Sequence, residues 1–238
     1  KIKIAGGALA GMYMALNLNS EKAYWLGTYE VDLQRAISDL VKPGMIAYDV
    51  GANIGYVTLM LARAVGESGK VFAFEALPNN FKRLTDNVHA NKYDNRVILS
   101  DNAVIDGFRQ IDFWRGPSAA MGKAEGSAGR KDLSYSESIT VQGISLDGFV
   151  LGQKHAHPDV IKMDIEGGEV LALPGMERIL KEISPIMLLE LHGPEAASIS
   201  CKILKQAGYR ICRMAPSYPI VNAIEELDWK AYLVGLKT

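Results

Sequence analysis

The chain has 238 residues, a formal net charge of −1 and 48% hydrophobic residues, values typical of a soluble globular protein with one large domain or two small ones. Its balanced charge argues against nucleic acid or an anionic membrane as the partner. Two cysteines, Cys201 and Cys212, are too few for a disulfide framework, and no histidines lie at the spacing of a zinc site. We therefore expect a cytoplasmic protein.

The first twenty residues predict strands rather than a targeting or membrane segment. An uncharged run from Ile4 to Ser20 follows Lys1 and Lys3, but it is rich in glycine and too short to span a bilayer. From Met12 to Asn19 Met and Leu side chains alternate with Tyr, Ala and Asn side chains, a period of two that is typical of a half-buried strand. We expect an N-terminal strand extension over 1–20 that caps the main fold or forms a homo-oligomer contact.

A helix is predicted next, over Val31–Val41, because apolar residues recur there at helical spacing and Pro43-Gly44 ends the pattern. Glu30 immediately precedes this helix. It either helps to hold the amino group of a ligand or acts as a solvated acid at the helix N-terminus.

The stretch Ile46–Ala62 predicts a buried strand, a tight glycine turn and a helix whose N-terminus faces a ligand. Its pattern is D-x-G-x-N-x-G, formed by Asp49, Gly51, Asn53 and Gly55. The dinucleotide pattern G-x-G-x-x-G fails at two of its three glycines, and the chain contains no phosphate-binding G-x-x-x-x-G-K-[ST] run. An acid beside the turn suits a cationic ligand group better than a pyrophosphate. The pattern resembles the first motif of S-adenosylmethionine-dependent methyltransferases, whose cofactor carries an amino group and a sulfonium.

Two further strands, Val71–Phe74 and Arg96–Ser100, alternate with helices. This order predicts an α/β fold with a doubly wound, mostly parallel sheet and the ligand at the carboxyl ends of the strands. Glu75 follows Val71–Phe74, the second strand of the sheet, where a carboxylate can accept hydrogen bonds from both hydroxyls of a ribose. The residues after the third strand flank an adenine in such sheets, and we assign them to the same cofactor site: Asp101, Asn102 and Ala103.

The pattern changes between 107 and 149, where we expect an inserted hairpin. Gln110–Trp114 and Ser138–Ile144 alternate like strands, and the segment 116–136 between them is rich in Gly, Ser and Ala with scattered basic residues. Loops of this length are usually lids, binding loops or disordered. A basic lid would suit an anionic acceptor, and a plain linker is the alternative.

The rest of the chain predicts the second half of the sheet, and nothing in it suggests a second domain or an internal repeat. We therefore expect a single domain over 1–238. The expected helix is Ala196–Ala207, and the expected strands are Asp159–Asp164, Pro185–Glu190, Tyr209–Met214 and Lys230–Leu236.

Several motifs together resemble the FkbM family of S-adenosylmethionine-dependent methyltransferases, over about Trp25 to His192. They are Gly27-Thr28-Tyr29-Glu30, the glycine turn, Phe74-Glu75, Ser145-Leu146-Asp147 and the more specific K-x-D-x-E-G-x-E block, Lys162–Glu169. The resemblance implies a Rossmann-like, seven-stranded sheet whose last strand runs antiparallel, and S-adenosyl-L-methionine as cofactor. It also implies O-methylation of sugars, glycans, lipid-linked acceptors or polyketide-like products. Gly168, where alanine is more usual, departs from the family pattern.

The candidate catalytic residues follow the fourth and fifth strands, where the methyl group should point. An aliphatic hydroxyl is a poor nucleophile at neutral pH and needs a base or a metal nearby. Asp164 is the first choice, as a base or as the group that orients the acceptor, with a cofactor contact as its alternative. His192 can serve as a general base. Glu166 and Glu190 are equally placed, and one of them can pair with Lys162.

We assign no metal site from the sequence, although Asp164, Glu190 and His192 could together bind Mg²⁺ or Mn²⁺. Acceptor specificity is expected in the hairpin, the N-terminal strands and the loop with His155 and His157. Two other functions stay open. A non-catalytic S-adenosylmethionine-binding module is one, and the intact acids argue against it. A methyltransferase for nitrogen or carbon acceptors is the other, but the usual Asn/Asp-Pro-Pro-Tyr tetrad of amine and amide enzymes does not follow the fourth strand.

Overall fold

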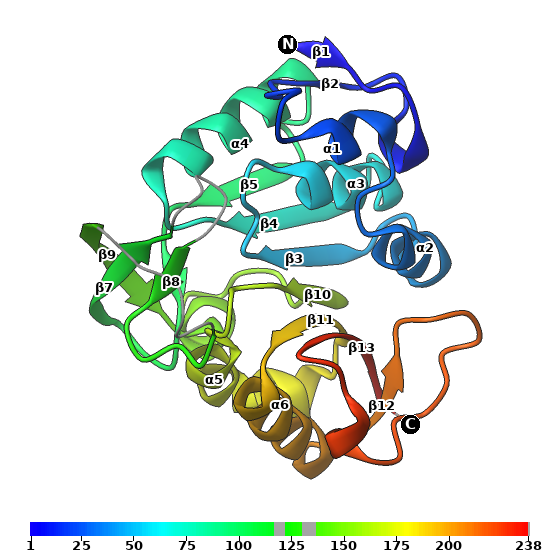
Figure 1. Cartoon of the computed structure of the whole chain (residues 1–238). Helices are drawn as coiled ribbons and strands as arrows, with labels where there is room; N and C mark the ends of the chain where they lie inside the picture. Colours follow the sequence, from blue (N-terminus) through cyan, green and yellow to red (C-terminus); the bar gives the residue numbers. More distant parts are fainter. Residues whose placement is uncertain (117–121, 130–136, 238) are drawn as a thin grey trace.

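A computed structural model of the chain describes residues 1–116, 122–129 and 137–237. Its centre is a seven-stranded sheet with the strand order β12-β13-β11-β10-β3-β4-β5 (Figure 1). Neighbouring strands are parallel except that β13 runs antiparallel to β11 and β12. The predicted doubly wound, Rossmann-like sheet and its antiparallel last strand are confirmed. The strands are β3 (Ile46–Val50), β4 (Lys70–Phe74), β5 (Val97–Ser100), β10 (Val160–Met163), β11 (Ile186–His192), β12 (Tyr209–Arg213) and β13 (Lys230–Lys237).

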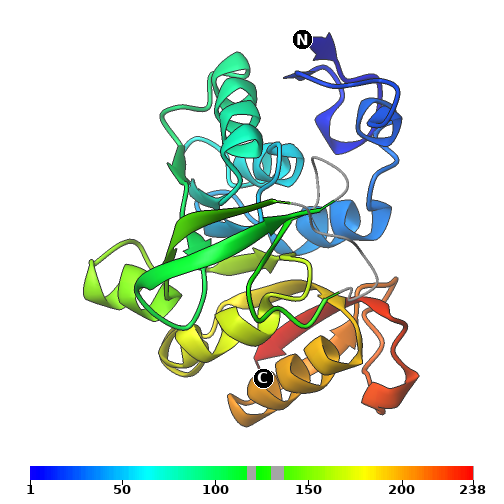
Figure 2. The same cartoon turned by 60° about the vertical axis from the view of Figure 1, so that its left-hand side comes forward.

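Helices cover both faces of this sheet (Figures 1 and 2). On one side lie α1 (Lys22–Leu26), α2 (Val31–Leu40), α3 (Tyr56–Ala64) and α4 (Pro78–Ala90), and on the other α5 (Glu169–Ala172) and α6 (Pro194–Gln206). Successive side chains of β3 point to opposite faces of the sheet. Ala47 packs in the hydrophobic core under the first group of helices, and Tyr48 packs in the core under the second group. Burial on both faces explains the continuous apolar runs of the central strands.

Short helical turns complete the layers. The helix after β10 breaks at Pro174, as predicted, because proline lacks the amide hydrogen that an α-helix needs. The 3₁₀ turns span Gly7–Leu9, Leu173–Met176 and Ile224–Glu226, and the π-helical turns span Gly148–Gly152 and Ile179–Ile183. In the described part of the chain, no helix combines the length and the apolar character that crossing a membrane requires.

The N-terminal strands are shorter than the alternation of the sequence predicts. Only β1 (Ile2–Lys3) and β2 (Tyr13–Met14) form, as an antiparallel pair. Beyond Met14 the expected strand is wrong, because the backbone bonds to side chains of α4 instead of to another strand: Ala15 N donates to Asn87 Oδ1 at 2.7 Å, and Arg83 donates to Ala15 O at 2.8 Å.

The insertion forms a second sheet with the order β6-β9-β7-β8, which lies in front of the main sheet in Figure 2. Its two long strands confirm the predicted hairpin, and β8 was not predicted. Most of the expected lid, 117–121 and 130–136, lies outside the described residues. The strands are β6 (Ala103–Val104), β7 (Arg109–Arg115), β8 (Gly122–Ala124) and β9 (Glu137–Ile144).

Candidate active site

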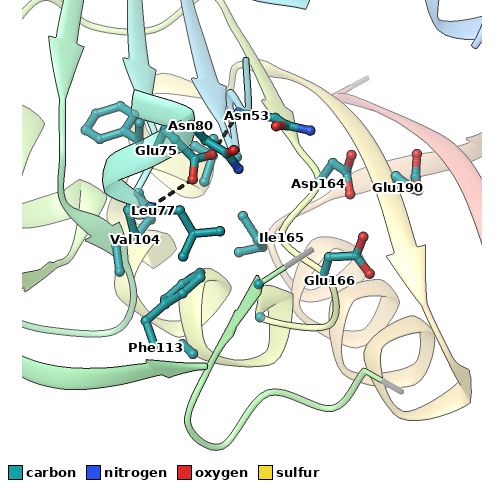
Figure 3. Close-up of a pocket in the computed structure, with 18 of the residues that line it drawn as sticks. Asn53, Glu75, Leu77, Asn80, Val104, Phe113, Asp164, Ile165, Glu166 and Glu190 are labelled. Carbon is teal, nitrogen blue, oxygen red and sulfur yellow. Dashed lines mark hydrogen bonds between the residues drawn. The ribbon is translucent and has the colours of Figure 1, made fainter. Parts of the chain in front are cut away.

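A pocket with an empty volume of about 1080 Å³ lies where the carboxyl ends of β3, β4 and β10 meet the inserted sheet (Figure 3). Its lining divides by chemistry. One end is acidic, with Asp164, Glu166 and Glu190, and the other is apolar, with Leu77, Val104 and Phe113. Polar side chains lie on the wall that joins the two ends, and they are Asn53, Glu75 and Asn80. This position, at the carboxyl edge of the sheet, is the predicted one.

The glycine turn after β3 needs glycine for steric reasons. Gly51 and Gly55 have φ values of 82° and 91°, in the left-handed region that favours glycine. A Cβ on Gly51 would lie 1.9 Å from the backbone oxygen of Asp164, so only glycine lets the exits of β3 and β10 approach this closely. A Cβ on Gly55 would meet Leu84 Cδ1 at 2.7 Å, which assigns this glycine to the packing of α3 against α4.

Asp49 is fully buried beneath the turn. Its Oδ1 lies 3.2 Å from Lys162 Nζ, and its Oδ2 accepts a hydrogen bond from Thr58 Oγ1 at 2.6 Å. The expected direct contact between Asp49 and a cationic ligand group is therefore corrected, because the carboxylate finds its counter-charge inside the protein. Asp49 supports the turn from below.

Lys162 ties this acid to the turn. Its ammonium also donates to Gly51 O at 2.8 Å. Burial alone would lower the pKa of Lys162, but the negative charges of Asp49, Asp164 and Glu30 together outweigh burial, and the pKa stays above its ordinary value. The prediction that Lys162 pairs with Glu166 or Glu190 is wrong, since the strand register places it beside Asp49.

Glu75 is the second buried acid of the turn. Its Oε2 accepts a hydrogen bond from Asn53 N at 2.8 Å, and its Oε1 accepts one from Leu77 N at 2.9 Å. Burial raises the pKa of Glu75 to about 7, although the two backbone donors act in the opposite direction. Each carboxylate oxygen has a further lone pair and can still accept a hydrogen bond from a ligand hydroxyl. Asn53 Oδ1 is buried with no hydrogen-bond partner in the described part of the chain, which leaves another acceptor at this wall.

The residues after β5 separate in space. Asn102 and Ala103 line the pocket, and Asn102 donates to Ser100 Oγ at 2.8 Å. Asp101 is exposed and lines a different, shallower groove between α4 and β9, together with Thr140. The expected contact of Asp101 with an adenine is therefore corrected: successive residues of an extended segment point to opposite sides, and Asp101 points away.

At the acidic end, Asp164 and Glu166 are the carboxylates with access to solvent, with side chains 20% and 31% exposed. Glu190 is buried behind them. Burial, followed by the charge of Glu190, raises the pKa of Asp164. The pKa of Glu190 is lowered, because its contacts with His192 and Lys230 outweigh the effect of burial.

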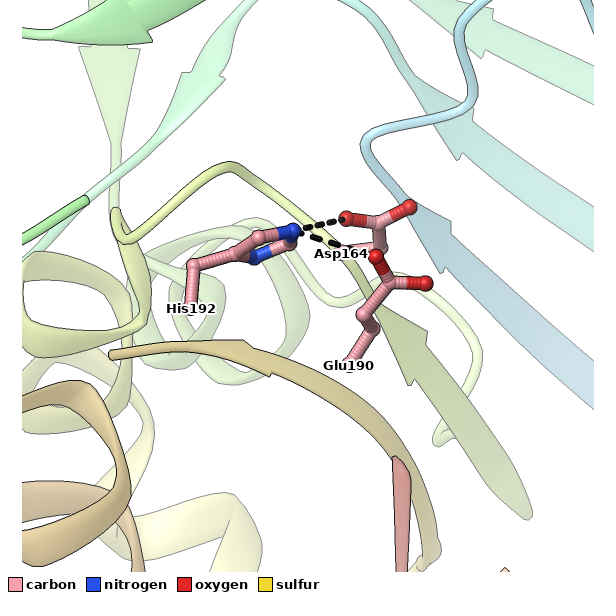
Figure 4. Close-up of side chains that lie close together, drawn as sticks. All are labelled: Asp164, Glu190 and His192. Atoms are coloured by element: carbon pink, nitrogen blue, oxygen red, sulfur yellow. Dashed lines mark ion pairs between the residues drawn. The ribbon is translucent and has the colours of Figure 1, made fainter. Parts of the chain in front are cut away.

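His192 is almost fully enclosed, with 3% of its surface exposed. Its Nε2 lies 3.0 Å from Glu190 Oε1 and 3.9 Å from Asp164 Oδ1 (Figure 4), and its Nδ1 faces Glu169 Oε1 at 3.8 Å. Burial would lower the pKa of His192, but the acids around it raise the pKa to about 10. The ring has acids on both sides and lies behind the pocket, so Asp164 rather than His192 lines the pocket.

Glu30 has a left-handed backbone (φ 46°) at the start of α2 and lines a small second cavity with Lys162, Asp164 and Glu190. Burial, then the charges of Glu190 and Asp164, raise its pKa. Its Oε1 is buried without a hydrogen-bond partner among the residues that the structure describes. Glu30 is therefore enclosed beside the acidic end, which argues against a solvated helix cap. Its predicted contact with the amino group of a ligand stays a prediction.

The insertion also contacts the loop that carries the acids. Ala128 N donates to Gly167 O at 2.9 Å. A Cβ on Gly129 would lie 2.1 Å from Glu166 O, so the two backbones cross in direct contact. The loop after β10 thus depends on the inserted segment for its position.

The model of the Methyltransferase FkbM domain family matches residues 49–211, which is more than half of the chain. The chain belongs to the FkbM methyltransferase family. Its cofactor is S-adenosyl-L-methionine. The residues fit this cofactor, since the buried acceptors at Glu75 and Asn53 lie beside an apolar wall large enough for a base.

This FkbM methyltransferase is 29% identical over 178 residues to the hexuronic acid methyltransferase AglP of Haloferax volcanii, a match that covers 75% of this chain and 69% of that protein. A shorter match, 41% identical over 64 residues, to the tRNA (adenine(58)-N(1))-methyltransferase TrmI of Thermus thermophilus covers 26% of this chain and 25% of that protein.

Solved structures share the fold of this FkbM methyltransferase at low identity. The methyltransferase FkbM of Methylobacillus flagellatus KT has a TM-score of 0.51 and 16% identity, covering 93% of this chain and 55% of that chain. The precorrin-6y C5,15-methyltransferase of Geobacter metallireducens GS-15 has a TM-score of 0.52 and 15% identity, covering 95% and 94%.

Sequence reasoning about this FkbM methyltransferase missed most of the apolar pocket wall. Phe113 comes from the inserted sheet, and Tyr24 and Tyr29, whose ring centroids lie 4.4 Å apart, come from the segment before the main sheet. Apolar alternation marked Phe113 as a strand residue without showing what it faces. The expected contribution of His155 and His157 to acceptor binding is wrong, because they precede β10 and lie at the opposite edge of the sheet.

Proposed function

We propose that this protein transfers a methyl group from S-adenosylmethionine to a hydroxyl of a sugar acceptor, with a hexuronic acid as the first candidate. The related protein from Haloferax volcanii acts on a hexuronic acid by name, and the match covers most of both chains. The observation that carries the proposal is Asp164, a partly exposed carboxylate at the acidic end of the cofactor pocket. Other glycans, lipid-linked sugars and polyketide-like alcohols remain acceptors to be tested.

Different pocket residues would contact different parts of the cofactor. When bound, the cofactor supplies an electrophilic methyl group on a sulfonium sulfur. Glu75 would accept hydrogen bonds from the ribose, and Leu77 and Phe113 would cover the adenine. Glu30 would meet the amino group of the methionine part. These contacts direct the reacting end toward Asp164, and holding two reactants in line removes much of the entropic barrier.

Asp164 has the properties of a proton acceptor for a hydroxyl. Its carboxylate reaches the pocket, and its raised pKa brings its basicity closer to that required at neutral pH. Glu166, also at the pocket surface, would hold a neighbouring hydroxyl of the sugar. His192 lies behind both carboxylates and would fix their positions rather than touch the acceptor.

The test measures methyl transfer from methyl-labelled S-adenosylmethionine to hexuronic acid glycosides, the matching neutral glycosides and lipid-linked sugars. Asp164→Asn should lower turnover by about 100-fold, within the range of a lost general base. Cofactor affinity, followed by calorimetry, should stay within about threefold of that of the unmodified protein. Asp101→Asn makes the same chemical change outside the pocket and should leave both quantities unchanged.

Two outcomes would contradict the proposal. Label found only on nitrogen or carbon, or no transfer to any hydroxyl while the cofactor binds normally, would exclude O-methylation. Loss of cofactor binding in Asp164→Asn would assign this residue to the cofactor instead of the acceptor.

A further inference from the structure

Three side chains at the acidic end converge in the way that the ligands of a metal ion do. Asp164 follows β10, and Glu190 and His192 end the neighbouring β11, so the parallel pairing of the two strands brings them together (Figure 4). One donor atom from each lies within 4.8 Å of the others. Donors at about 2.1 Å from a small divalent cation are spaced by about 3.0–4.2 Å, and His192 Nε2 lies 3.0 Å from Glu190 and 3.9 Å from Asp164.

A buried carboxylate oxygen without a partner points to a ligand here. Glu190 is 5% exposed, and its Oε2 has no hydrogen-bond partner among the described residues. Leaving such a group unsatisfied in the interior is costly unless something binds it. The carboxylate of Glu190 lies directly beside that of Asp164 in Figure 4, so a cation between them would meet both.

The imidazole of His192 also faces a carboxylate on the side away from Asp164 and Glu190. Glu169, fully buried, faces Nδ1 on the far side of the ring, which leaves Nε2 directed at the two carboxylates. A carboxylate in this position accepts a hydrogen bond from a ligating imidazole. At 3.8 Å the Glu169 contact is longer than a hydrogen bond, and Nδ1 has no other hydrogen-bond partner among the described residues. Glu169 itself is fixed by Ile165, whose backbone N–H donates to Oε1 at 3.2 Å.

The charges at this end leave room for a cation. The carboxylates at this end are Asp164, Glu166 and Glu190, with Glu30 and Glu169 beside them. Among the described residues, the cationic groups that face them are Lys230 and the ring of His192, while Lys162 is paired with Asp49. The ammonium of Lys230 contacts Glu190 Oε1, and its side chain is 43% exposed. It can therefore swing away from Glu190, and it would compete with a cation for this carboxylate.

We propose that Asp164, Glu190 and His192 bind a divalent cation of the Mg²⁺ or Mn²⁺ class, which binds the acceptor. This inference rests on the proposed hydroxyl methylation. On binding, the ring gives up its proton to solvent and Lys230 leaves Glu190. The cation then coordinates the acceptor hydroxyl and favours its deprotonation. Asp164 can hold the cation with one oxygen and accept the hydroxyl proton with the other. The cation also offsets the repulsion between this acidic end and the carboxylate of a hexuronic acid.

The test uses electron paramagnetic resonance to follow the binding of Mn²⁺ to the full chain, without cofactor or acceptor. We expect one site that fills below about 1 mM, the weak end of protein divalent-cation sites. Glu190→Gln should weaken binding by at least about tenfold, because it removes a charged ligand. Lys230→Met should tighten binding by about tenfold, because it removes the competing ammonium. Glu182→Gln, at an exposed acid that pairs with Arg178 in the turn before the amino end of β11, should change nothing.

In a metal site the two variants change the Mn²⁺ affinity in opposite directions. In a structural ion-pair network, Glu190→Gln and Lys230→Met would both disturb the local structure, and Lys230→Met would not tighten Mn²⁺ binding. Mn²⁺ binding that is absent below about 1 mM, or unchanged in both variants, would overturn the inference. Methyl transfer to a hydroxyl that survives chelation with no Mn²⁺ bound would overturn it and leave the proposed function intact. Mn²⁺ binding without methyl transfer to any hydroxyl would contradict the proposed function and leave the metal site.

Discussion

Asp49 and Lys162 form a buried pair whose two members depend on each other. Both are less than 5% exposed, and Thr58 is the remaining contact of the acid. Replacing one partner of a buried ion pair leaves an uncompensated charge, which costs more than the pair itself contributes. The pair also holds the glycine turn through Gly51 O.

Lys162→Met should therefore lower the free energy of unfolding by about 3–5 kcal/mol, measured by urea denaturation. Lys82→Met breaks an exposed ion pair of similar length with Asp86 and should have no measurable effect. Equal changes in the free energy of unfolding would show that burial does not increase the cost of breaking the Asp49–Lys162 pair. Restoring part of the loss by adding Asp49→Asn to Lys162→Met would confirm the unpaired charge as the cause.

We expect Glu75 to make cofactor binding dependent on pH. Ribose hydroxyls donate hydrogen bonds, so they prefer the ionised carboxylate, and burial raises the pKa of Glu75 to about 7. The affinity for S-adenosylhomocysteine should consequently rise from about pH 6 to about pH 8 and then level off. Calorimetry across this range measures it. Glu75→Gln should bind more weakly at every pH without the rise; a rise that persists in this variant would assign the pH dependence to another group.

At the scale of elements, we expect the inserted sheet to affect catalysis through its contact with the loop after β10. Gly129 and Glu166 cross with no room for a side chain. A methyl group at Gly129 must push the acidic loop aside, and displacements of about 1 Å can cost about 100-fold in rate.

Gly129→Ala should therefore reduce turnover by about 10–100-fold. Gly152→Ala is the matched control, since a Cβ there meets no atom within 4 Å. Steady-state methyl transfer and thermal unfolding, measured side by side, separate a shifted loop from a global loss of stability. Full activity in Gly129→Ala would show that the crossing does not position the acids.

For the whole molecule, the cofactor joins parts that are distant in sequence. The pocket draws on α1, the main sheet from β4 to β13 and the inserted sheet, so binding should stabilise them together. S-adenosylhomocysteine at one hundred times its Kd should add about 2.7 kcal/mol to the free energy of unfolding. For a chain of this size the midpoint should rise by about 5–10 °C in scanning calorimetry. A rise confined to a separate, later transition would contradict binding across the whole fold.

The sequence by itself determined the sheet and predicted the edge of the sheet at which the pocket lies. The apolar runs, the glycine turn and the helix after it depend on residues close together in the chain, so period and spacing predict them. The expected strands differ from the observed ones by at most two residues in the main sheet. Glu75 and the loop after β10 were assigned correctly to the pocket because strand ends in a parallel sheet meet at one edge.

Only the tertiary structure decided which charges meet. Asp49 and Lys162 lie 113 residues apart, and their pairing follows from the register of β3 and β10, which no local pattern contains. The same holds for Phe113 in the pocket wall, for Lys230 on Glu190 and for Asp101 outside the pocket. A carboxylate looks the same in sequence whether it is exposed or enclosed. Its partners and its pKa depend on burial, and burial is a property of the packed molecule.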